Sequence, residues 1–326
     1  MIPVDIKTSI DYPIPDHANR LGYSLGGISL SVFKLLFISG VILAYFGYQP
    51  SPEGAHQSML FIDGSWLLSI IRSVHSLSSE FFIILIILHA TRVVLSKSYH
   101  GQRRITWNAG ILLAAVAAGF FFTGSVLKWD QEGYEALGHV LWTNNMLPFG
   151  GYVNNLLFSG NVPLKIFVAH AVLLPAVLLI VVSVHLLCVK ILKISPRNPA
   201  HGEPAQTSSF GRHLRGLAGY SLIAFGVIVI AAVFYTPPLL DAPYSGVEWT
   251  KPPWPFLFLY TLENWFGMWI LLAIPPVIFL SLFGLPYLSK PSDKWDAAQI
   301  LYFAMLVLFL VLILAGAWSK PVQHMM

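Results

Sequence analysis

The chain has 326 residues, of which 56% are hydrophobic and only 10% are charged, with a formal net charge of +4. Soluble domains carry roughly a quarter charged residues, so this composition excludes an ordinary soluble protein and is typical of one that crosses a membrane several times. The single cysteine, Cys188, excludes an internal disulfide and any iron–sulfur or zinc site built from several cysteines.

Seven apolar segments are long enough to cross a bilayer as helices, which takes about 20 residues. We expect them near residues 28–48, 70–95, 107–127, 165–190, 216–236, 257–284 and 298–318. The mixed segment 134–158 predicts short helices at the membrane surface. Because a polar segment precedes the first span, we expect no cleavable signal peptide. The predicted fold class is an all-α membrane protein with seven transmembrane helices.

The positions of Lys and Arg predict the topology. If the N-terminus is cytoplasmic, most of them fall on the cytoplasmic side, as the positive-inside rule requires. We therefore interpret the positive charge as a topology signal and not as a sign of nucleic-acid binding. We therefore expect a multi-pass protein of the cell inner (cytoplasmic) membrane with its C-terminus outside. Residues 1–195 hold four spans and residues 216–326 hold three. The polar segment 196–215, rich in proline, is predicted to be a linker.

Four histidines lie inside predicted spans: His75 and His89 in the second, His170 and His185 in the fourth. At 100° per residue, their separations bring each pair back to nearly one helix face, about 21–22 Å apart along the axis. His75 and His170 lie near the outer ends of their helices, and His89 and His185 near the inner ends. Two antiparallel helices thus offer two His–His pairs at two depths, the axial ligation that two low-spin haems require.

The alternative is that these histidines only bridge helices, which is the better explanation for a lone intramembrane histidine. Four histidines in two matched pairs favour a functional site, because polar groups in spans tend to be functional. Glycines repeat a similar spacing on the first and third spans, where a flat macrocycle needs small residues, although ordinary helix packing is the alternative. These glycines are Gly26, Gly40, Gly110 and Gly124.

Three basic residues lie close to these histidines in the sequence: Arg72, Arg92 and Lys190. Each is placed to pair with a haem propionate. Arg92 and Lys190 fit positive-inside anchoring equally well, whereas Arg72 lies on the predicted outer side.

These segments resemble the cytochrome b/b6 family. Residues 71–75 and 87–93 are similar to its second helix, and residues 23–28, 128–131 and the Leu174-Pro175 pair match further signatures. The fifteen-residue spacing in the fourth span is similar to the chloroplast-type branch. The part from Gly202 onward looks like the small partner subunit of that branch (subunit IV), fused here into one chain.

The resemblance implies a membrane cytochrome b subunit of a quinol-oxidising complex, an oxidoreductase that passes electrons from quinol to cytochrome c or a similar acceptor. It implies two haems b, a quinol-oxidation site near the outer face and a quinone-reduction site near the inner face. The implied partners are a Rieske iron–sulfur protein, or another iron–sulfur or c-type cytochrome subunit, and a second copy of the chain. Near the inner face, Asp16, His17 and Arg20 are placed to approach a quinone or simply lipid headgroups.

Two positions depart from the family pattern. Ser24 stands where the chloroplast-type protein attaches a c-type haem through cysteine, so we expect no covalent haem. Pro253 stands where the family's Pro-Glu-Trp-Tyr signature has its glutamate, so the quinol proton needs another acceptor.

The outer-site candidates are Trp254, Glu248 and Glu263, with Asp241 nearby; each carboxylate is equally well explained as a solvated loop charge. Tyr134 corresponds only loosely to the family's outer-site tyrosine. The Pro253 substitution leaves open a di-haem relay to a non-Rieske partner without bifurcation. A transporter or channel without haem is a further alternative, but it does not explain the matched depths of the histidines and glycines.

Overall fold

The computed structural model describes residues 12–195, 207–246, 248–290, 292 and 294–321. Within these residues seven helices are long and apolar enough to cross a membrane, which confirms the predicted fold class. They are α2 (Leu21–Phe46), α4 (Trp66–Leu95), α5 (Arg104–Leu127), the continuous run of α8 (Val162–Val168), η3 (Ala169–Leu173) and α9 (Leu174–Leu192), then α10 (Phe210–Phe234), α12 (Trp269–Leu288) and α13 (Ala297–Trp318). The shorter elements are β1 (Pro13–Pro15), η1 (Asp16–Asn19), α3 (Gly54–Gly64), η2 (Gly101–Arg103), α6 (Gln131–Asn145), α7 (Gly150–Phe158), β2 (Thr207–Ser209), η4 (Trp254–Phe256) and α11 (Leu257–Phe266).

Several helices begin at a side chain that caps their first turn. Asp130 accepts a hydrogen bond from Gly133 N (3.0 Å) at the start of α6, and Asp296 accepts one from Gln299 N (3.1 Å) at the start of α13. A cap of this kind stabilises a helix by about 1 kcal/mol. These caps determine where the chain leaves its loops and begins each helix.

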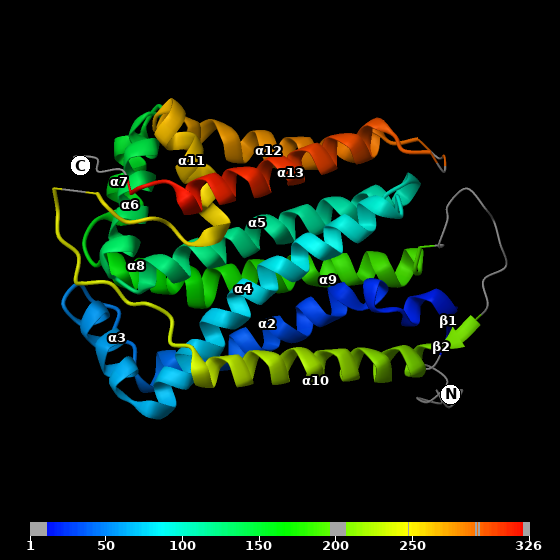
Figure 1. The fold of residues 1–326 in the computed structure, drawn as a ribbon, viewed down its shortest axis with the longest axis horizontal. Coiled ribbons are helices and arrows are strands. Elements are labelled where there is room, and N and C mark those ends of the chain that lie inside the picture. Colours follow the sequence, from blue (N-terminus) through cyan, green and yellow to red (C-terminus); the bar gives the residue numbers. More distant parts are fainter. Residues whose placement is uncertain (1–11, 196–206, 247, 291, 293, 322–326) are drawn as a thin grey trace.

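The long helices run side by side along one axis (Figure 1). One buried cluster joins α2, α4 and α10, with Val32, Val74 and Ile228 at its centre. A second cluster joins α4 and α5 to α12 and α13, through residues such as Trp107 and Leu285. The C-terminal helices therefore flank the N-terminal bundle on two sides: α10 lies beside α2, and α12 and α13 lie beside α5.

The N-terminal segment is tied to the start of α10. Strand β1 pairs antiparallel with β2, with Pro13 opposite Ser209. Residues 196–206 of the predicted linker lie outside the described residues. Since α10 already begins at Phe210, the linker is helical in its last residues, while the division into two domains at this point stays a prediction.

The predicted sixth span, 257–284, is present but begins too early. The chain forms the short helix α11, turns at Gly267 and then crosses as α12, which ends at Leu288. Gly267 has a φ of +88°, a conformation that glycine adopts at little cost and other residues avoid. The apolar run was read as one helix because hydropathy does not register a turn made by a single glycine.

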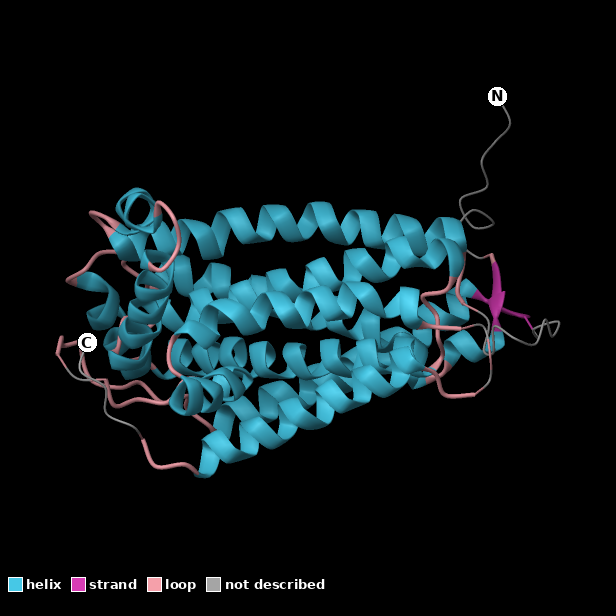
Figure 2. Ribbon diagram, turned by 90° about the horizontal axis from the view of Figure 1, so that it is seen from above, coloured by secondary structure: helices cyan, strands magenta, loops and turns pink. Residues whose placement is uncertain are grey.

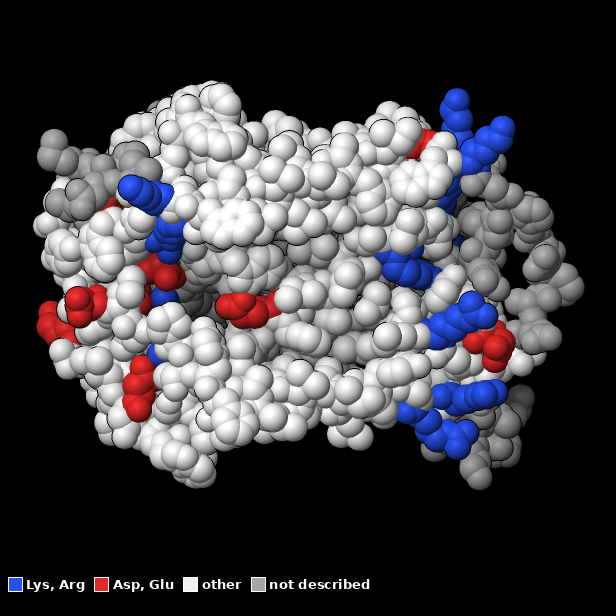
Figure 3. Space-filling model, viewed as in Figure 1, with Lys and Arg blue, Asp and Glu red and all other residues white. Residues whose placement is uncertain are grey.

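The surface helices expected in segment 134–158 are confirmed as α6 and α7, which with α11 lie at one end of the bundle (Figures 1 and 2). The N-terminal end of the described chain and the β1–β2 pair lie at the opposite end. On the face drawn in Figure 3, Lys and Arg gather toward the β1–β2 end, while most acidic side chains lie toward the α6–α7 end. This asymmetry is the one from which the sequence predicts a cytoplasmic N-terminus.

Candidate functional site

Two of the predicted histidines face each other inside the bundle. His75 on α4 and His170 on η3 have ring centroids 6.3 Å apart and ring planes at 61°. This spacing is compatible with one iron held between the two rings. His89 and His185 lie within electrostatic reach of each other toward the other end of the same helices. The structure thus brings the four side chains together in the pairs that their positions in the sequence predict.

Three of the four rings are oriented by hydrogen bonds to the helix beside them, while Nδ1 of His89 is buried with no hydrogen-bond partner among the described residues. Three of the four Nδ1 atoms bond an oxygen on α2 or α5, which leaves Nε2 to face the space between the helices. Such a bond on one ring nitrogen fixes the tautomer and makes the other nitrogen a good metal ligand. The Nδ1 bonds run from His75 to Leu36 O (3.1 Å) and Ser39 Oγ (3.0 Å), from His170 to Thr123 Oγ1 (2.9 Å), and from His185 to Thr106 O (3.0 Å).

Each of the four glycines lies against the ring of a different histidine. A Cβ atom on any of these glycines would touch a single imidazole Cε1. A side chain at Gly26, Gly40 or Gly124 would therefore press on a ring, whereas at Gly110 the contact would be an ordinary one. The distances from such a Cβ to Cε1 are 3.0 Å for Gly26 and His89, 3.1 Å for Gly40 and His75, 3.5 Å for Gly110 and His185, and 3.2 Å for Gly124 and His170.

The fourth span contains a feature that explains its fifteen-residue histidine spacing. Residues Ala169–Leu173, which include His170, form one turn of π-helix inside an otherwise α-helical span. A turn closed by i→i+5 bonds holds one residue more than an α-helical turn. This turn accommodates the extra residue. His170 and His185 therefore lie on the same face and at the same axial separation that a fourteen-residue spacing gives His75 and His89 on α4.

The basic residues near the histidines differ in their surroundings. Arg92 has Nε and Nη2 buried without a hydrogen-bond partner within the described residues, and its guanidinium lies 3.5 Å from the centre of the Tyr23 ring. Arg72 instead donates to Asp63 (2.6 and 2.8 Å) and to Pro237 O (2.6 Å). Lys190 is exposed at the end of α9. Arg92 is thus the one of the three with buried donors left over for a propionate.

Taken together, these residues fit a b-type haem. Three of the imidazoles are held by bonds on Nδ1 that leave Nε2 available. Each of the four faces a glycine on a neighbouring helix, and the buried guanidinium of Arg92 has donors without a partner among the described residues. Ser24 is buried and its hydroxyl bonds Arg20 O at 3.4 Å. His17, expected near the inner face, bonds Ser195 O at 3.0 Å and so ties η1 to the end of the fourth span.

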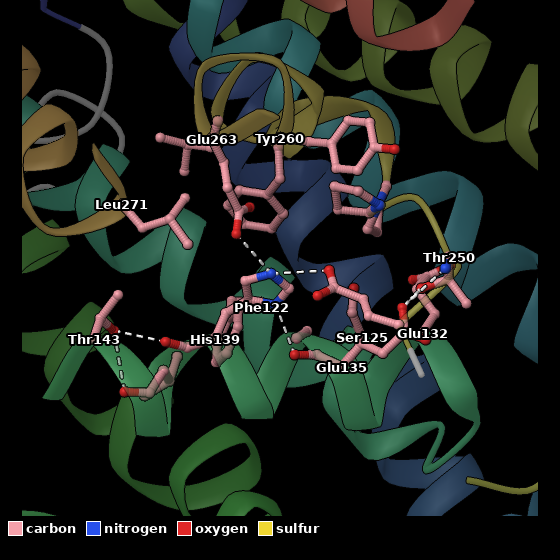
Figure 4. Close-up of a pocket in the computed structure, with 17 residues that line it drawn as sticks. Phe122, Ser125, Glu132, Glu135, His139, Thr143, Thr250, Tyr260, Glu263 and Leu271 are labelled. Carbon is pink, nitrogen blue, oxygen red and sulfur yellow. Dashed lines mark hydrogen bonds and ion pairs between the residues drawn. The ribbon is translucent and has the colours of Figure 1, made fainter. Parts of the chain in front are cut away.

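A separate cavity of about 220 Å³ lies where α6, α11 and the segment before η4 meet (Figure 4). Its apolar wall includes Phe122, Phe256 and Leu271. Its polar lining includes Glu248 and Glu263, two of the predicted outer-site residues. Pro253 lines the cavity as well, so the position that lacks the family's glutamate belongs to this site.

His139 on α6 joins the two glutamates. Its Nε2 lies 3.0 Å from Glu248 Oε1 and 3.1 Å from Glu263 Oε1, and its Nδ1 lies 2.8 Å from Glu135 O (Figure 4). Burial alone lowers the pKa of His139, but the bonds and charges of Glu248 and Glu263 outweigh it and raise the pKa to about 10. At neutral pH the three side chains therefore form an ion-paired cluster with an imidazolium at its centre.

The other acidic residues of the cavity are engaged elsewhere. Glu135 accepts bonds from Trp249 N (3.1 Å), Thr250 N (2.9 Å) and Gln131 Nε2 (2.8 Å), which fastens the 241–250 loop to α6. Glu132 pairs with Lys128 at 3.0 Å. Burial raises the pKa of Glu132, and the charge of Lys128 acts against this shift.

The third candidate, Trp254, is not among the residues that line the cavity. Its indole Nε1 donates to Glu80 on α4, a carboxylate in the middle of a membrane span. Asp241 accepts a bond from Gln131 N through its backbone oxygen (3.0 Å). Sequence reasoning therefore placed two of its three candidates in the cavity.

Sequence reasoning missed His139 and Glu80. His139 lies outside the predicted spans, and only the folding of α11 against α6 brings it to Glu263. For Glu80 there was a signal, since a carboxylate in the middle of an apolar span is costly and usually has a role.

Comparisons with known proteins agree with this geometry. The family described as Cytochrome b/b6/petB matches residues 9–193. The cytochrome b6 of Heliomicrobium gestii is 31% identical over 196 residues, which cover 58% of this chain and 92% of that protein. A cytochrome bc complex cytochrome b subunit of Chlorobaculum thiosulfatiphilum is 27% identical over 332 residues, covering 94% of this chain and 75% of that protein. A solved structure described as a hyperthermophilic respiratory complex III has the same fold, with a TM-score of 0.79 and 19% identity over 95% of this chain and 87% of that one.

Proposed function

This chain belongs to the cytochrome b/b6 family, and we propose that it carries electrons through two haems b between an outer quinol-oxidation site and an inner quinone-reduction site. It is the cytochrome b subunit of a bc-type, quinol-oxidising membrane complex. The observation that carries the proposal is the one-to-one meeting of four imidazoles and four glycines within a single bundle.

His75 and His170 would hold one haem, and His89 and His185 the other. When bound, the two haems supply reversible one-electron transfer along the bundle. The protein's part is to present Nε2 of each histidine and to leave space at the glycines. Arg92 would hold a propionate through its buried donors. Arg72 would have to share its guanidinium with Asp63, so its role as a propionate partner is less well supported.

We place the outer quinol site in the cavity lined by Glu248, Glu263 and Phe256. An apolar wall with a few converging polar groups is the usual character of a small-molecule site, and the cavity includes the Pro253 position of the family's quinol-site signature. Trp254 does not line the cavity. It would contribute indirectly, through the hydrogen bond from its indole to Glu80.

The partners follow from the same assignment. A bc-type complex contains further subunits, and here we propose a Rieske iron–sulfur protein, or another iron–sulfur or c-type cytochrome subunit, as the outer electron acceptor, and a second copy of this chain as a dimer partner. The charge asymmetry of the two ends supports a cytoplasmic N-terminus in the cell inner membrane.

One experiment separates this function from a di-haem relay without bifurcation, the alternative favoured by Pro253. In the purified complex, with an inner-site inhibitor present, a pulse of oxidant in the presence of quinol should transiently reduce haem b if quinol oxidation bifurcates. A simple relay would show only oxidation of haem b under the same conditions. A purified protein without haem b would contradict both.

A further inference from the structure

We propose that Glu248 and Glu263, held on either side of His139, accept the quinol proton that the family's missing glutamate would otherwise take. The inference rests on the outer quinol site proposed above, and it assigns the acid–base groups of that site. The two carboxylates are the catalytic groups, and His139 is a positioning residue.

The three side chains come from separate parts of the chain. His139 lies on α6, Glu263 on α11 and Glu248 in the segment that follows α10. Both glutamate side chains are almost fully buried, at 5% and 6% exposure, and that of His139 is 18% exposed. Buried carboxylates are costly unless they are paired. Their convergence on a single nitrogen at a cavity wall is therefore a built arrangement and not a surface ion pair.

The charge of the cluster suits it for taking up one proton. With both nitrogens protonated, His139 donates from Nδ1 to Glu135 O, and its Nε2 lies 3.0 Å from Glu248 and 3.1 Å from Glu263. One cation and two carboxylates leave a net charge of −1. One N–H cannot point along both contacts, so one carboxylate is always less well satisfied than the other. Addition of one proton to that carboxylate makes the cluster neutral.

The other titratable groups facing the cavity are less suited to this role. Glu135 already accepts donors from the 249–250 segment and from Gln131. Glu132, in the first turn of α6, is paired with Lys128. Tyr260, also in the lining, presents a phenol and not a carboxylate. Glu248 and Glu263 remain as the acceptors that face the cavity with a cation between them.

The step balances as follows. The quinol O–H bond breaks as the first electron leaves for the outer one-electron acceptor, and the proton forms a new O–H bond on a carboxylate oxygen. Once that carboxylate has released its proton, the second electron leaves along the bundle, the second quinol O–H bond breaks, its proton goes to the same carboxylate, and the quinol becomes a quinone. The protonated carboxyl is neutral, so its ion pair with His139 weakens. The carboxyl can then release the proton to the outer aqueous phase.

The test uses the purified whole complex and decylubiquinol or menadiol as the probe. Loss of a general base lowers rates by roughly 10²–10⁴-fold, so the double variant Glu248→Gln/Glu263→Gln should reduce haem b at least about 100-fold more slowly than wild type. Each single variant should lose about tenfold, since the other carboxylate remains. Glu53→Gln, an exposed carboxylate at the start of α3, is the matched control and should leave the rate unchanged.

His139→Gln tests the positioning role separately. Without the cation, proton binding by the adjacent carboxylates becomes more favourable. The pH–rate profile should then shift toward alkaline pH while the KM for quinol changes little. A merely structural role would lower the rate at every pH without moving the profile.

Two results would overturn the inference while leaving the proposed function intact. One is a double variant that oxidises quinol at the wild-type rate with both haem bands present. The other is a wild-type redox-difference infrared spectrum without a protonated-carboxyl band, a measurement that does not depend on any variant folding. Wild-type complex that contains haem b but is reduced by neither quinol would overturn the outer site itself, and the inference with it.

Discussion

At the scale of single residues, four glycine positions and four histidine rings define the proposed haem-binding part of the molecule. The spacing of these residues was readable from the sequence because helical periodicity relates position to depth and face. What the sequence did not contain is which glycine faces which ring, since that depends on how α2 packs on α4 and α5 on α9. The contacts make the substitutions at these positions unequal.

Alanine should be harmful at Gly26 and tolerated at Gly110. A Cβ at Gly26 lies 3.0 Å from His89 Cε1, whereas one at Gly110 lies 3.5 Å from His185 Cε1, an ordinary contact distance. Overpacking of this kind costs about 1–3 kcal/mol. Reduced-minus-oxidised spectra should show lowered haem occupancy or a shifted midpoint potential in Gly26→Ala only. Equal spectra for the two variants would show that the close contact at Gly26 is relaxed in the protein.

The His139 cluster predicts a pH dependence of stability. Since Glu248 and Glu263 raise the pKa of His139 to about 10, its protonated form is favoured in the folded state. The stabilisation is fully present below the ordinary histidine pKa, and it is lost as the pH rises through about 10. The difference in Tm between wild type and His139→Gln should therefore be largest just below the ordinary histidine pKa and shrink steadily toward pH 10. A difference that grows with pH would contradict the ion pair.

At the scale of elements, two departures from regular helix matter most. The π-helical turn at Ala169–Leu173 reconciles a fifteen-residue spacing on one helix with a fourteen-residue spacing on the other. The break at Gly267 turns α11 back against α6 and so brings Glu263 to His139. Neither was predictable from hydropathy, because each depends on the backbone conformation of a few residues and not on their polarity. The sequence could predict the residues of the cavity only where a family signature pointed to them.

Deletion of Val172 should preserve both haems. It removes one residue from the π-helical turn, which can then close as α-helix and keep His170 and His185 in relation to each other. Insertion of one alanine after Val172 adds about 100° of rotation and should abolish binding of one haem. Both changes are made at Val172, whose side chain is exposed, so neither removes a core contact. The haem spectra of the two purified variants can therefore be compared directly. Loss of a haem in the deletion variant and not in the insertion variant would contradict this account of the turn.

At the scale of the whole molecule, composition was enough to predict a seven-span all-α protein, because a bilayer imposes length and apolarity on every span. The placement of α10 on one side of the bundle and of α12 and α13 on another came only with the structure. The proposed haem-binding bundle and the C-terminal helices therefore share two buried apolar clusters.

The orientation can be tested with single cysteines in a Cys188→Ser background. Ser159 lies exposed after α7 and Gln102 lies exposed in η2, at opposite ends of the bundle. In intact spheroplasts a membrane-impermeant maleimide should label Ser159→Cys, while Gln102→Cys should react only after the membrane is permeabilised. The reverse pattern would place the N-terminus outside.

The central claim is that four imidazoles in this chain bind two haems. The most direct test is the haem b content of the purified complex per copy of the chain, measured by the pyridine haemochrome assay, for wild type and for His89→Leu. We expect two haems b per wild-type chain and one in the variant, with the haem between His75 and His170 retained. One haem or none in the wild type, or two in the variant, would contradict the assignment.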